Sequence, residues 1–318
     1  MGILQPSSDT IEQAARFIRE GELVAFPTET VYGLGGNALD PIAVAKIFEV
    51  KNRPHFDPLI VHIADPDMLG FICDISAIEK KLSAAFWPGP LTLVLPKKPV
   101  IGDLVTSGLP NVAVRMPNHD IALKLIRAAG VPIAAPSANR FGYLSPTSAR
   151  HVDKTIGHLI SAILDGGPCD VGVESTILDY DGHTWTLLRA GGIATEVLSD
   201  WLGEPIRLAT KQANPSSPGQ LTQHYSPRTP IVVTTTEHPD SAQQTGYLGF
   251  QNPPANPAAY KTIEILSAAG DYREAAARLF AALHHLDEAG LDLIIAEPVP
   301  AVGLGAAIMD RLTRAAAK

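Results

Sequence analysis

Through the first two thirds of the chain, short apolar runs alternate with stretches in which apolar residues recur at helical spacing. After Asp9-Thr10, which is typical of a helix start, this spacing predicts a helix over 11–20 that Gly21 ends. Asp40 as N-cap and Pro41 in the first turn predict a second helix over 41–50. The same signals predict helices at 78–86, 120–129 and 148–156, and short strands at 23–26, 59–63, 91–95, 112–116, 132–135 and 160–164.

A β-hairpin is the next feature of the pattern. Asp181-Gly182 separates two apolar runs, at 175–180 and 184–189, and this dipeptide is a strong signal for a tight hairpin turn. Hairpin strands are antiparallel, whereas strands joined by helices are usually parallel. The first two thirds of the chain therefore predict a mixed sheet covered by helices.

Between 208 and 229 the apolar pattern lapses into Gln, Asn, Ser and Pro, which predicts a linker. Beyond it, strands are expected at 231–235, 246–250, 263–266 and 291–296, and helices at 272–289 and 306–317. This alternation predicts a second, compact α/β unit with a largely parallel sheet. We therefore expect a first domain over 1–207, a linker over 208–229 and a second domain over 230–318.

Composition narrows the class of protein. The chain has 318 residues, 46% of them hydrophobic and 18% charged, with a net charge of −8. No apolar run approaches the ~20 residues of a membrane span, so a cytoplasmic protein without membrane contact is expected. Cys73 and Cys169 are far apart in sequence and predict buried free thiols, with neither a disulfide nor a zinc site. The acidic balance disfavours a protein that grips duplex nucleic acid with its whole surface, although a local basic groove is allowed.

The most informative local feature is Lys-Asn-Arg-Pro at 51–54, which follows a hydroxyl- and glycine-rich turn at 27–36. Lys51 as a point charge and Arg53 as a planar fork can bind different oxygens of one triphosphate. The turn offers hydroxyl groups from Thr28 and Thr30, and its glycines are expected to let backbone amides approach a ligand: Gly33, Gly35 and Gly36. The alternative is that Lys51 and Arg53 form the solvated end of the helix over 41–50.

Other sequence motifs for nucleotide binding or hydrolysis are either rejected or absent. The segment 33–38 fits G-x-G-x-x-A, but its glycines come several residues after the preceding strand, so a dinucleotide fingerprint is rejected. No Gly-Lys dipeptide and no Gly-x-Ser-x-Gly sequence occurs. His284 and His285 are adjacent on a predicted helix and cannot share one face, so a surface position is expected for them.

An ordered series of motifs covers nearly the whole chain: Pro-Thr-Glu-Thr-Val-Tyr-Gly-Leu (27–34), Lys-x-Arg-Pro (51–54), Pro-Leu-Ile-Val-His (58–62), Trp-Pro-Gly-Pro-Leu-Thr (87–92), Val-Ala-Val-Arg-Met-Pro (112–117), Pro-Ser-Ala-Asn (136–139), Glu-Ser-Thr-Ile (174–177), Ser-Pro-Gly (217–219), His-Tyr (224–225), Gly-Leu-Gly (303–305) and Asp-Arg-Leu (310–312). With these motifs the chain resembles the threonylcarbamoyl-adenylate synthases of the Sua5 and YrdC family, in their longer, two-domain Sua5 form. The resemblance implies a YrdC-like domain, a twisted mixed sheet with a concave cationic groove, and a smaller Rossmann-like C-terminal domain.

The resemblance also implies a reaction. These enzymes join L-threonine, bicarbonate and ATP into threonylcarbamoyl-adenylate and release pyrophosphate, the first stage of the N6-threonylcarbamoyl modification of adenosine 37 in tRNA. Magnesium is expected to be held mainly by ATP and water, with no assigned protein ligand. Glu29 is a candidate partner behind the metal or a structural residue of its loop. Expected partners are the small substrates and the transferase machinery that acts on tRNA; contact with tRNA or double-stranded RNA itself is left open.

The resemblance also implies roles for individual residues of the matching motifs. Lys51 and Arg53 are the residues expected to neutralise the triphosphate and so to be catalytic. The other expected ATP-binding residues are Asp57, Asn111, Ser137, Asn139, Ser145 at a helix start, Arg189 and Tyr225. The expected threonine-binding residues are Thr30, His62, Arg115, Ala135 and Ser175, with Arg115 on the substrate carboxylate. As alternatives, Arg115 forms a structural ion pair, His62 is a core histidine and Ser175 bonds only within its strand.

Two of these positions depart from the family pattern. Asp57 stands where Asn is usual before Pro-Leu, and Asn111 where Thr commonly precedes Val-Ala-Val-Arg. An extra carboxylate beside Lys51 and Arg53 is expected to weaken the attraction for phosphate unless it binds metal.

The linker is richer in polar and aromatic residues than a spacer requires, and we interpret it as a lid that brings Tyr225 to the nucleotide. A plain tether is the alternative. Two other functions remain open from the sequence: a non-catalytic module that binds tRNA or double-stranded RNA, and a related carbamoyl-adenylate-forming enzyme that uses another amine.

Overall fold

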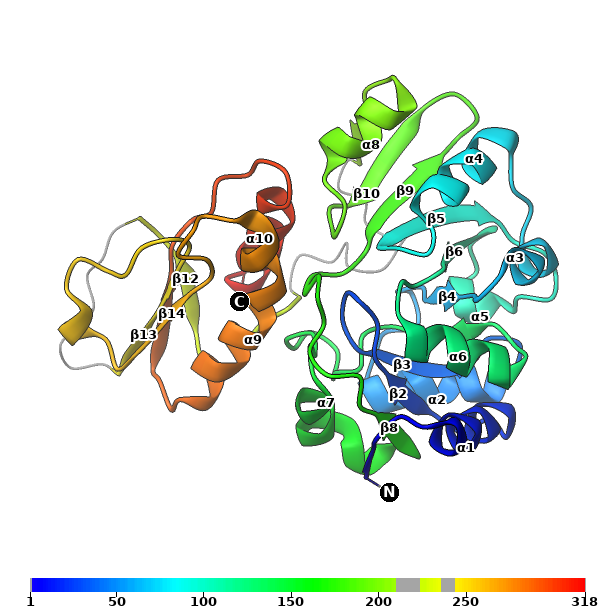
Figure 1. Ribbon diagram of the computed structural model, residues 1–318, viewed down its shortest axis with the longest axis horizontal. Coiled ribbons are helices and arrows are strands. Elements are labelled where there is room, and N and C mark those ends of the chain that lie inside the picture. Colours follow the sequence, from blue (N-terminus) through cyan, green and yellow to red (C-terminus); the bar gives the residue numbers. More distant parts are fainter. Residues whose placement is uncertain (1, 210–223, 236–243, 318) are drawn as a thin grey trace.

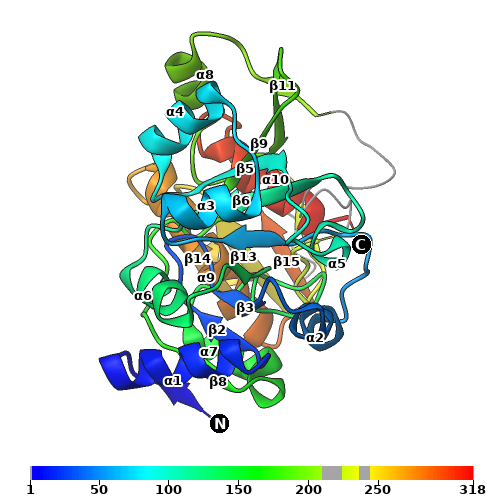
Figure 2. The same cartoon turned by 90° about the vertical axis from the view of Figure 1, so that its right-hand side faces the viewer.

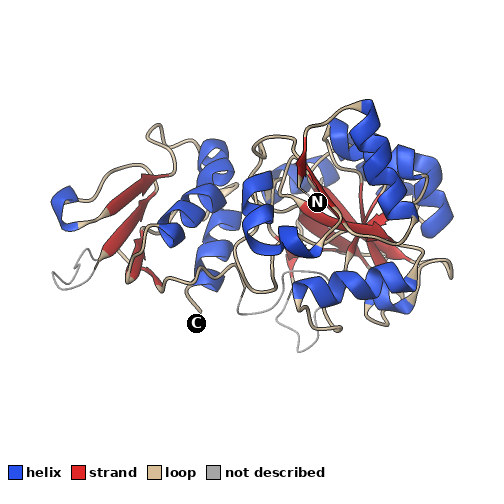
Figure 3. Cartoon of the chain, turned by 90° about the horizontal axis from the view of Figure 1, so that it is seen from below, coloured by secondary structure: helices blue, strands red, loops and turns tan. Residues whose placement is uncertain are grey.

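The computed structural model describes residues 2–209, 224–235 and 244–317. Within them the chain forms two β-sheets, one of eleven strands and one of four (Figure 1). Helices α9 (Tyr272–Glu288) and α10 (Gly305–Ala315) belong to the second sheet and lie between the two sheets, as Figures 1 and 3 show. The two sheets therefore meet through helices.

The first sheet mixes parallel and antiparallel neighbours in the order β1-β8-β2-β3-β7-β4-β6-β5-β9-β10-β11. Its strands are β1 (Ile3–Leu4), β2 (Val24–Phe26), β3 (Gly33–Asn37), β4 (Ile60–His62), β5 (Leu91–Pro96), β6 (Asn111–Arg115), β7 (Ile133–Ala134), β8 (Ala162–Leu164), β9 (Thr176–Tyr180), β10 (Trp185–Arg189) and β11 (Arg207–Leu208). The predicted mixed sheet is confirmed, and the predicted hairpin is the antiparallel pair β9–β10.

Helices cover both faces of the first sheet: α1 (Ser8–Arg19), α2 (Pro41–Lys51), α3 (Pro66–Ile72), α4 (Ala77–Phe86), α5 (Asp103–Thr106), α6 (Asp120–Ala129), α7 (Ala149–Ile156) and α8 (Thr195–Leu202). In Figure 2, α4 and α8 lie at one end of the sheet and α1 at the other. Strand β2 shows how the faces divide, because neighbouring side chains of a strand point in opposite directions. Phe26 packs with α1 and α6, whereas Ala25 belongs to the core that includes Ile47 of α2.

The predicted helices of this region are present, with small shifts at their ends. The first helix starts earlier than expected, because Ser7 rather than Asp9-Thr10 caps it: the Thr10 amide donates to the Ser7 hydroxyl at 3.2 Å. The second starts as predicted, with Asp40 as N-cap and Pro41 in its first turn. The elements β1, β11, α3, α5 and α8 were not expected; all but α8 carry seven residues or fewer, too few for a clear apolar period.

The glycines after the Thr-Glu-Thr segment correct one expectation. Gly33, Gly35 and Gly36 lie in strand β3, paired with β2 and β7, rather than in a ligand-binding loop. A Cβ atom on Gly35 would lie 2.8 Å from both Phe26 and Ile133. These glycines therefore allow close packing of a strand on neighbouring side chains.

The second sheet is parallel throughout, in the order β12-β15-β13-β14, and its strands are β12 (Ile231–Val233), β13 (Thr245–Gly249), β14 (Thr262–Ile265) and β15 (Leu293–Ala296). Every element expected in this unit is present. One-turn 3₁₀ segments, η1 (Gly157–Leu159) and η2 (Pro257–Ala259), complete the described secondary structure. The expected fold class, a mixed-sheet domain followed by a smaller parallel α/β domain, is confirmed.

The segment interpreted as a linker is only partly described. Leu208 already belongs to strand β11, and 210–223 lie outside the described residues. Residues 224–227 are buried again, with Tyr225 only 1% exposed. The described end of this segment is thus packed into the protein, which a plain tether does not require.

Apolar side chains of the two units share one core. Val31, Leu144 and Val173 from the first unit pack in the same cluster as Tyr225 and Phe280. A Cβ atom on Gly172 would lie 2.4 Å from the backbone oxygen of Ala276 in α9, so the two backbones approach closely. The second unit is therefore packed against the first.

The adjacent histidines of α9 correct a second expectation. His285 is exposed, as predicted, and its Nδ1 lies 2.5 Å from Glu264 Oε1. His284 is half-buried instead: its ring stacks on His151 of α7 at 3.9 Å, and its Nε2 lies 3.1 Å from the Ser145 carbonyl oxygen. Because α9 faces the first unit, one of two adjacent side chains meets that unit and the other meets solvent.

Candidate functional site

A small cavity of about 50 Å³ lies where the first sheet, the Ser-Ala-Asn loop and the His224-Tyr225 segment meet. Its lining combines guanidinium groups, hydroxyl groups and aromatic rings: Thr28, Thr30, Val31, Gly33, Arg53, Ile60, His62, Arg115, Ala135, Pro136, Ser137, Glu174, Ser175, Arg189, His224 and Tyr225. Nine of the fourteen site residues expected from the sequence are among them. The fold thus gathers side chains from many separate segments at one place.

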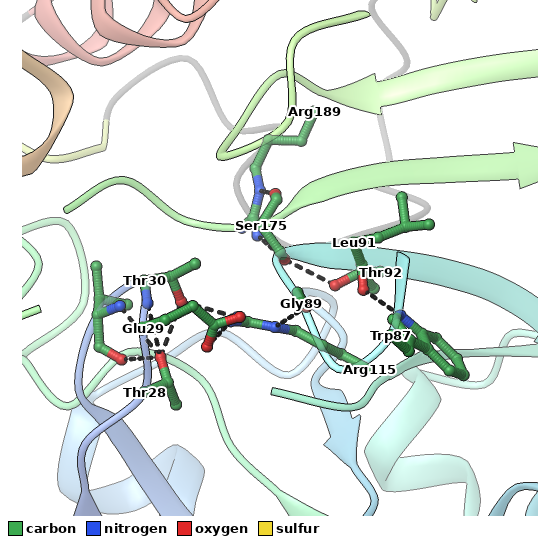
Figure 4. Close-up of polar contacts among 11 residues, drawn as sticks. Thr28, Glu29, Thr30, Trp87, Gly89, Leu91, Thr92, Arg115, Ser175 and Arg189 are labelled. Carbon is green, nitrogen blue, oxygen red and sulfur yellow. Dashed lines mark hydrogen bonds and ion pairs between the residues drawn. The ribbon is translucent and has the colours of Figure 1, made fainter. Parts of the chain in front are cut away.

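The Thr-Glu-Thr loop and β6 form one wall of this cavity (Figure 4). Thr28 shapes the loop, because its hydroxyl donates to the Val31 carbonyl at 2.6 Å and lies 2.9 Å from the Thr30 hydroxyl. Arg115 donates from Nη1 to Thr30 Oγ1 at 2.8 Å, and its Nη2 lies 2.6 Å from Glu29 Oε2. Glu29 is therefore the counter-ion of Arg115 and holds its guanidinium in a fixed orientation.

The opposite wall comes from the hairpin. Arg189 at the end of β10 donates to the Ser175 carbonyl at 3.1 Å and to the Ser175 hydroxyl at 3.0 Å. That hydroxyl also lies 2.7 Å from Thr92 Oγ1 of β5, as Figure 4 shows. The register shift between Leu187 and Arg189 in the β9–β10 pair accompanies this contact. Ser175, which immediately precedes β9, therefore bonds to residues of β5 and β10 and lines the cavity.

Arg53 reaches the cavity and carries its own counter-ion. Its Nη2 lies 2.9 Å from Asp57 Oδ2, and its fork also donates to the carbonyls of Asp57 and Pro58, at 2.9 and 2.8 Å. Asp57 is fully buried. Burial raises the pKa of Asp57, while Arg53 and Lys51 oppose that rise. The alternative of a solvated helix end is wrong, because both cations are buried inside the protein.

Lys51 does not line the cavity. Its ammonium group donates to the backbone carbonyls of Ser137 and Asn139, at 2.6 and 2.5 Å. Burial lowers the pKa of Lys51 well below its usual value, and neighbouring Arg53 lowers it further. In this conformation Lys51 holds the Ser-Ala-Asn loop against the end of α2.

Four more expected residues lie away from the cavity wall. Asp57 and Asn139 stand directly behind it, as partners of Arg53 and Lys51. Asn111 begins β6, whereas Arg115 ends it, so Asn111 is ~13 Å from the cavity end of that strand. Ser145 is not at a helix start, because Ser148 caps α7; the Ser145 hydroxyl donates to Glu174 at 2.5 Å instead. The expectation that Ser145 stands at a helix start is therefore wrong.

The reasoning from sequence missed Glu174, His224 and Arg311, which surround the cavity or Tyr225. Glu174 belongs to the Glu-Ser-Thr-Ile motif and Arg311 to the Asp-Arg-Leu motif, but nothing in the sequence shows that the two motifs are in contact. Arg311 Nε donates to Glu174 Oε2 at 2.9 Å. Only the packing of α10 against the first unit brings this pair together.

The titratable groups of the cavity keep one charge state around neutral pH. Burial, and then Arg115, lowers the pKa of His62 to about 3, and burial lowers that of His224 to about 3. Burial raises the pKa of Tyr225 to about 12. Arg311 and Arg189 outweigh the effect of burial and hold the pKa of Glu174 at about 2. The cavity therefore contains fixed charges and neutral donors rather than a group that exchanges protons near pH 7.

No group of three His, Cys, Asp or Glu side chains suited to a metal ion occurs among the residues the structure describes. The three carboxylates nearest the cavity already have cationic partners, since Glu29 pairs with Arg115, Asp57 with Arg53 and Glu174 with Arg311. These residues suit a metal ion that arrives on phosphate oxygens rather than one bound by carboxylates.

Comparison with protein families covers nearly the whole chain. The Sua5, YciO and YrdC family, described as "Telomere recombination", matches residues 16–191. The family described as "Threonylcarbamoyl-AMP synthase, C-terminal domain" matches 193–317. The chain belongs to the Sua5 family.

Full-length relatives support this membership. The threonylcarbamoyl-AMP synthase of Pyrococcus abyssi (strain GE5 / Orsay) is 43% identical over 324 residues, 96% of this chain and 93% of the relative. That of Bacillus subtilis (strain 168) is 43% identical over 329 residues, 98% and 94% of the two chains. The crystal structure of P. abyssi Sua5 complexed with L-threonine matches with a TM-score of 0.92 and 41% identity, covering 99% of this chain and 97% of that one. The predicted resemblance to the two-domain Sua5 form is confirmed.

In this Sua5-family member, as far as the structure describes it, no helix is both long and apolar enough to cross a membrane. Cys73 and Cys169 are both buried free thiols, as expected.

Proposed function

We propose that this Sua5-family protein is an L-threonylcarbamoyladenylate synthase, which makes threonylcarbamoyl-AMP and pyrophosphate from L-threonine, bicarbonate and ATP. The observation that carries the proposal is a single cavity that gathers the guanidinium groups of Arg53, Arg115 and Arg189 with the hydroxyls of Thr30 and Ser175. Guanidinium forks suit both carboxylate and phosphate oxygens. The product would enter the N6-threonylcarbamoyl modification of adenosine 37 in tRNA.

We assign the wall of Arg115 to threonine. Thr30, His62, Ala135 and Ser175 line the same cavity, so they would contact the amino acid while Arg115 holds its carboxylate. Since Nη2 of Arg115 already pairs with Glu29 and Nη1 with Thr30, the substrate must share or replace these partners. The orientation of Arg115 is preset, which reduces the entropy lost on binding.

We assign the side of Arg53 to ATP. Arg53, Arg189 and Ser137 of the Ser-Ala-Asn loop line the cavity directly. Lys51, Asp57 and Asn139 support that wall from behind, and Tyr225 closes it. Asn111, at the start of β6, and Ser145, whose hydroxyl is bonded to Glu174, lie outside the cavity wall, and nucleotide contacts at these two residues stay proposals.

The chemistry needs orientation and charge rather than a proton shuttle. The threonine amine and bicarbonate give a carbamate with loss of water, and a carbamate oxygen then attacks the α-phosphorus while pyrophosphate leaves. Because the carbamate oxygen is already anionic, no general base is required at the second step. Fixed donors around a pentavalent phosphorus stabilise the charge that spreads over its oxygens. His62 and His224 stay neutral around pH 7 because burial lowers the pKa of each, which agrees with a reaction that needs no proton shuttle.

Magnesium enters the proposal as a cation carried by ATP. When bound, it would neutralise charge on the phosphate oxygens, with water and phosphate as its main ligands. Glu29 is a less suitable metal partner than expected, because it is committed to Arg115.

The cavity must enlarge before substrates bind. A volume of about 50 Å³ is far below the roughly 300–1,000 Å³ of ordinary ligand pockets. His224 and Tyr225 form part of its wall and belong to the segment interpreted as a lid. We therefore retain the lid as a proposal for these described residues; the part at 210–223 lies outside them. Deletion of 216–225 that leaves adenylate formation unchanged would refute it.

The function is tested without RNA. Purified protein is incubated with ATP, magnesium, L-threonine and labelled bicarbonate, and pyrophosphate and labelled adenylate are measured. We expect both to appear in equal amounts and only when threonine is present. Binding of tRNA or double-stranded RNA without pyrophosphate release would instead favour the non-catalytic RNA module. Faster release with another amine in a side-by-side series would favour the related carbamoyl-adenylate enzyme.

The remaining expectations stay proposals. We propose domains over 1–207 and 230–318 joined by 208–229, a cytoplasmic location, and hand-over of the product to a tRNA-modifying transferase. The cationic groove expected in the first domain is likewise a proposal, as is direct contact with RNA.

A further inference from the structure

Arg311 is an exception within the second domain. Among the described residues from 230 onward, it is the one charged side chain that is buried, and it is 0% exposed. It lies on α10, one of the two helices between the sheets (Figure 1). A buried guanidinium is costly unless charged or hydrogen-bonded partners compensate it. Its partners therefore indicate why this charge is kept inside.

The first partner is Glu174 of the catalytic domain. Arg311 Nε donates to Glu174 Oε2 at 2.9 Å, while the other carboxylate oxygen accepts from the Ser145 hydroxyl at 2.5 Å. Glu174 lines the cavity and immediately precedes Ser175, whose hydroxyl bonds to Arg189. A residue of the second domain thus contacts the segment that leads into β9 and carries Ser175 of the hairpin wall.

The second partner is the aromatic ring of Tyr225. The guanidinium carbon of Arg311 lies 5.1 Å from the ring centroid, within the range of a cation–π interaction. Phe280 of α9 packs on the same ring at 5.7 Å. At the end of the Arg311 fork, Nη1 donates to Asp310 Oδ2 at 2.7 Å, whereas Nη2 has no hydrogen-bond partner among the described residues.

Tyr225 needs such support, because its backbone has a φ of +62°, a value that L-residues other than Gly adopt at a cost. The next residue is anchored to both domains: the Ser226 amide donates to the Gly142 carbonyl at 2.8 Å, and its hydroxyl to the Ala315 carbonyl of α10 at 3.3 Å. The segment is therefore held against the cavity from the side of α10.

We infer that Arg311 is a positioning residue of this enzyme: from α10 it fixes Tyr225 against the cavity and Glu174 beside Ser175, so that the second domain completes the substrate site. The inference rests on the proposed function. It gives the second domain a direct part in the reaction, because loss of Arg311 frees the Tyr225 ring and leaves the site open to water. A simple structural ion pair would instead affect stability alone.

The test compares Arg311→Met with Arg314→Met. Arg314 is on the same helix and pairs with Asp310, as Arg311 Nη1 also does. Its variant removes one partner of that shared carboxylate but leaves the contacts of Arg311 with Glu174 and Tyr225 in place, so it serves as a control. We expect Arg311→Met to lower kcat/KM for ATP roughly tenfold or more. We also expect a lower yield of adenylate per pyrophosphate, since water then reaches threonylcarbamoyl-AMP and hydrolyses it to AMP and the carbamate after pyrophosphate has left. Arg314→Met is expected to keep both values.

A second measurement is independent of activity. Amide hydrogen exchange of a peptide spanning 224–229 reports whether the segment stays docked through the Ser226 amide. We expect exchange there to accelerate at least roughly tenfold in Arg311→Met and to stay unchanged in Arg314→Met. Arg311→Lys keeps a charge for Glu174 but loses the planar face, so it should retain stability and still loosen the segment.

A double-mutant cycle assigns the effect to Tyr225. If Arg311 acts through that ring, Tyr225→Leu combined with Arg311→Met is no worse than Tyr225→Leu alone. If Arg311→Met does not fold, Glu174→Gln with Arg311→Met removes both buried charges and takes its place. Independent, additive losses, or an Arg311 variant that matches the Arg314 control, would overturn the inference. Failure of the wild-type protein to form any adenylate would instead overturn the proposed function.

Discussion

The two domains bury different kinds of side chain. The core of the second domain is apolar apart from Arg311 and small hydroxyl residues, whereas the first domain buries Glu29, Lys51, Arg53, Asp57, His62, Arg115, Glu174 and Arg189 around one cavity. Burying a charge costs free energy even when it is paired. The first domain therefore gives up stability to hold charges in place, and the second gains stability from regular packing. Buried charged side chains therefore mark the functional part of the molecule. Arg311 is the buried charged residue in the described part of the second domain, and its partner Glu174 belongs to the first.

Removal of a cavity cation tests the first half of this comparison and carries the largest expected effect. Arg53→Met leaves Asp57 buried without its counter-ion, which should cost about 3–5 kcal/mol of stability. We expect kcat/KM for ATP to fall roughly 100-fold or more, because a charged donor at the phosphate side is lost. Urea unfolding and pyrophosphate release measure the two effects. Arg19→Met breaks an exposed ion pair and should change neither.

Truncation of an apolar side chain tests the second half. Leu279 of α9 is fully buried in the core of the second domain, so Leu279→Ala should lower the free energy of unfolding by about 2–5 kcal/mol. At a temperature where the variant stays folded, its activity should be close to that of the wild type. Val302, 63% exposed, provides the control, since Val302→Ala removes methyl groups from solvent rather than from a core. A large drop in activity of the folded Leu279 variant would contradict the division between the domains.

Acid titration sharpens the link between the domains. The pKa of Glu174 is about 2, below its ordinary value of 4.5, so its contribution to stability is complete above pH 4.5 and is lost as the pH falls toward 2. This shift corresponds to roughly 3 kcal/mol. We expect Glu174→Gln to be less stable than the wild type at pH 7, with a difference that shrinks through this pH window. A difference that stays constant from pH 7 to pH 3 would show that the Arg311 pair is not the cause.

Asp57 gives the smallest expected effect and tests a feature of this particular chain. Arg53 keeps two backbone acceptors, the carbonyls of Asp57 and Pro58, so Asp57→Asn should leave its fork in place. Removal of the negative charge beside Arg53 should lower KM for ATP roughly three- to tenfold. Asp103→Asn changes the net charge equally at an exposed position and should leave KM unchanged. An increased KM for Asp57→Asn would mean that the carboxylate contacts the nucleotide or its metal.

The fold was predictable where the pattern was regular. Long amphipathic stretches such as α6 and α9, and the capped start of α2 at Asp40-Pro41, were predicted within a residue or two. Short elements such as α3 and β11 were not, because seven residues or fewer carry too little periodicity. The strand of glycines, β3, reads as a loop because glycine has no side chain to indicate burial; only its packing on Phe26 shows the difference.

The site was predictable in its chemistry and not in its contacts. Motifs named Arg53, Arg115 and Ser175, and the cavity brings them together. The same motifs placed Lys51 beside the cavity, whereas it donates to the backbone of the Ser-Ala-Asn loop. Ser145 was predicted at a helix start, but the cap of α7 is Ser148, three positions further along the chain.

The sequence by itself determined the elements, the two units and the family, because apolar spacing and short motifs are local and survive without knowledge of the rest of the chain. Only the tertiary structure decided which charges are paired, since Glu174 and Arg311 are 137 positions apart and meet only when α10 packs against the first domain. Burial then set the charge state of His62 and Tyr225, because the cost of a buried charge depends on surroundings that distant segments supply.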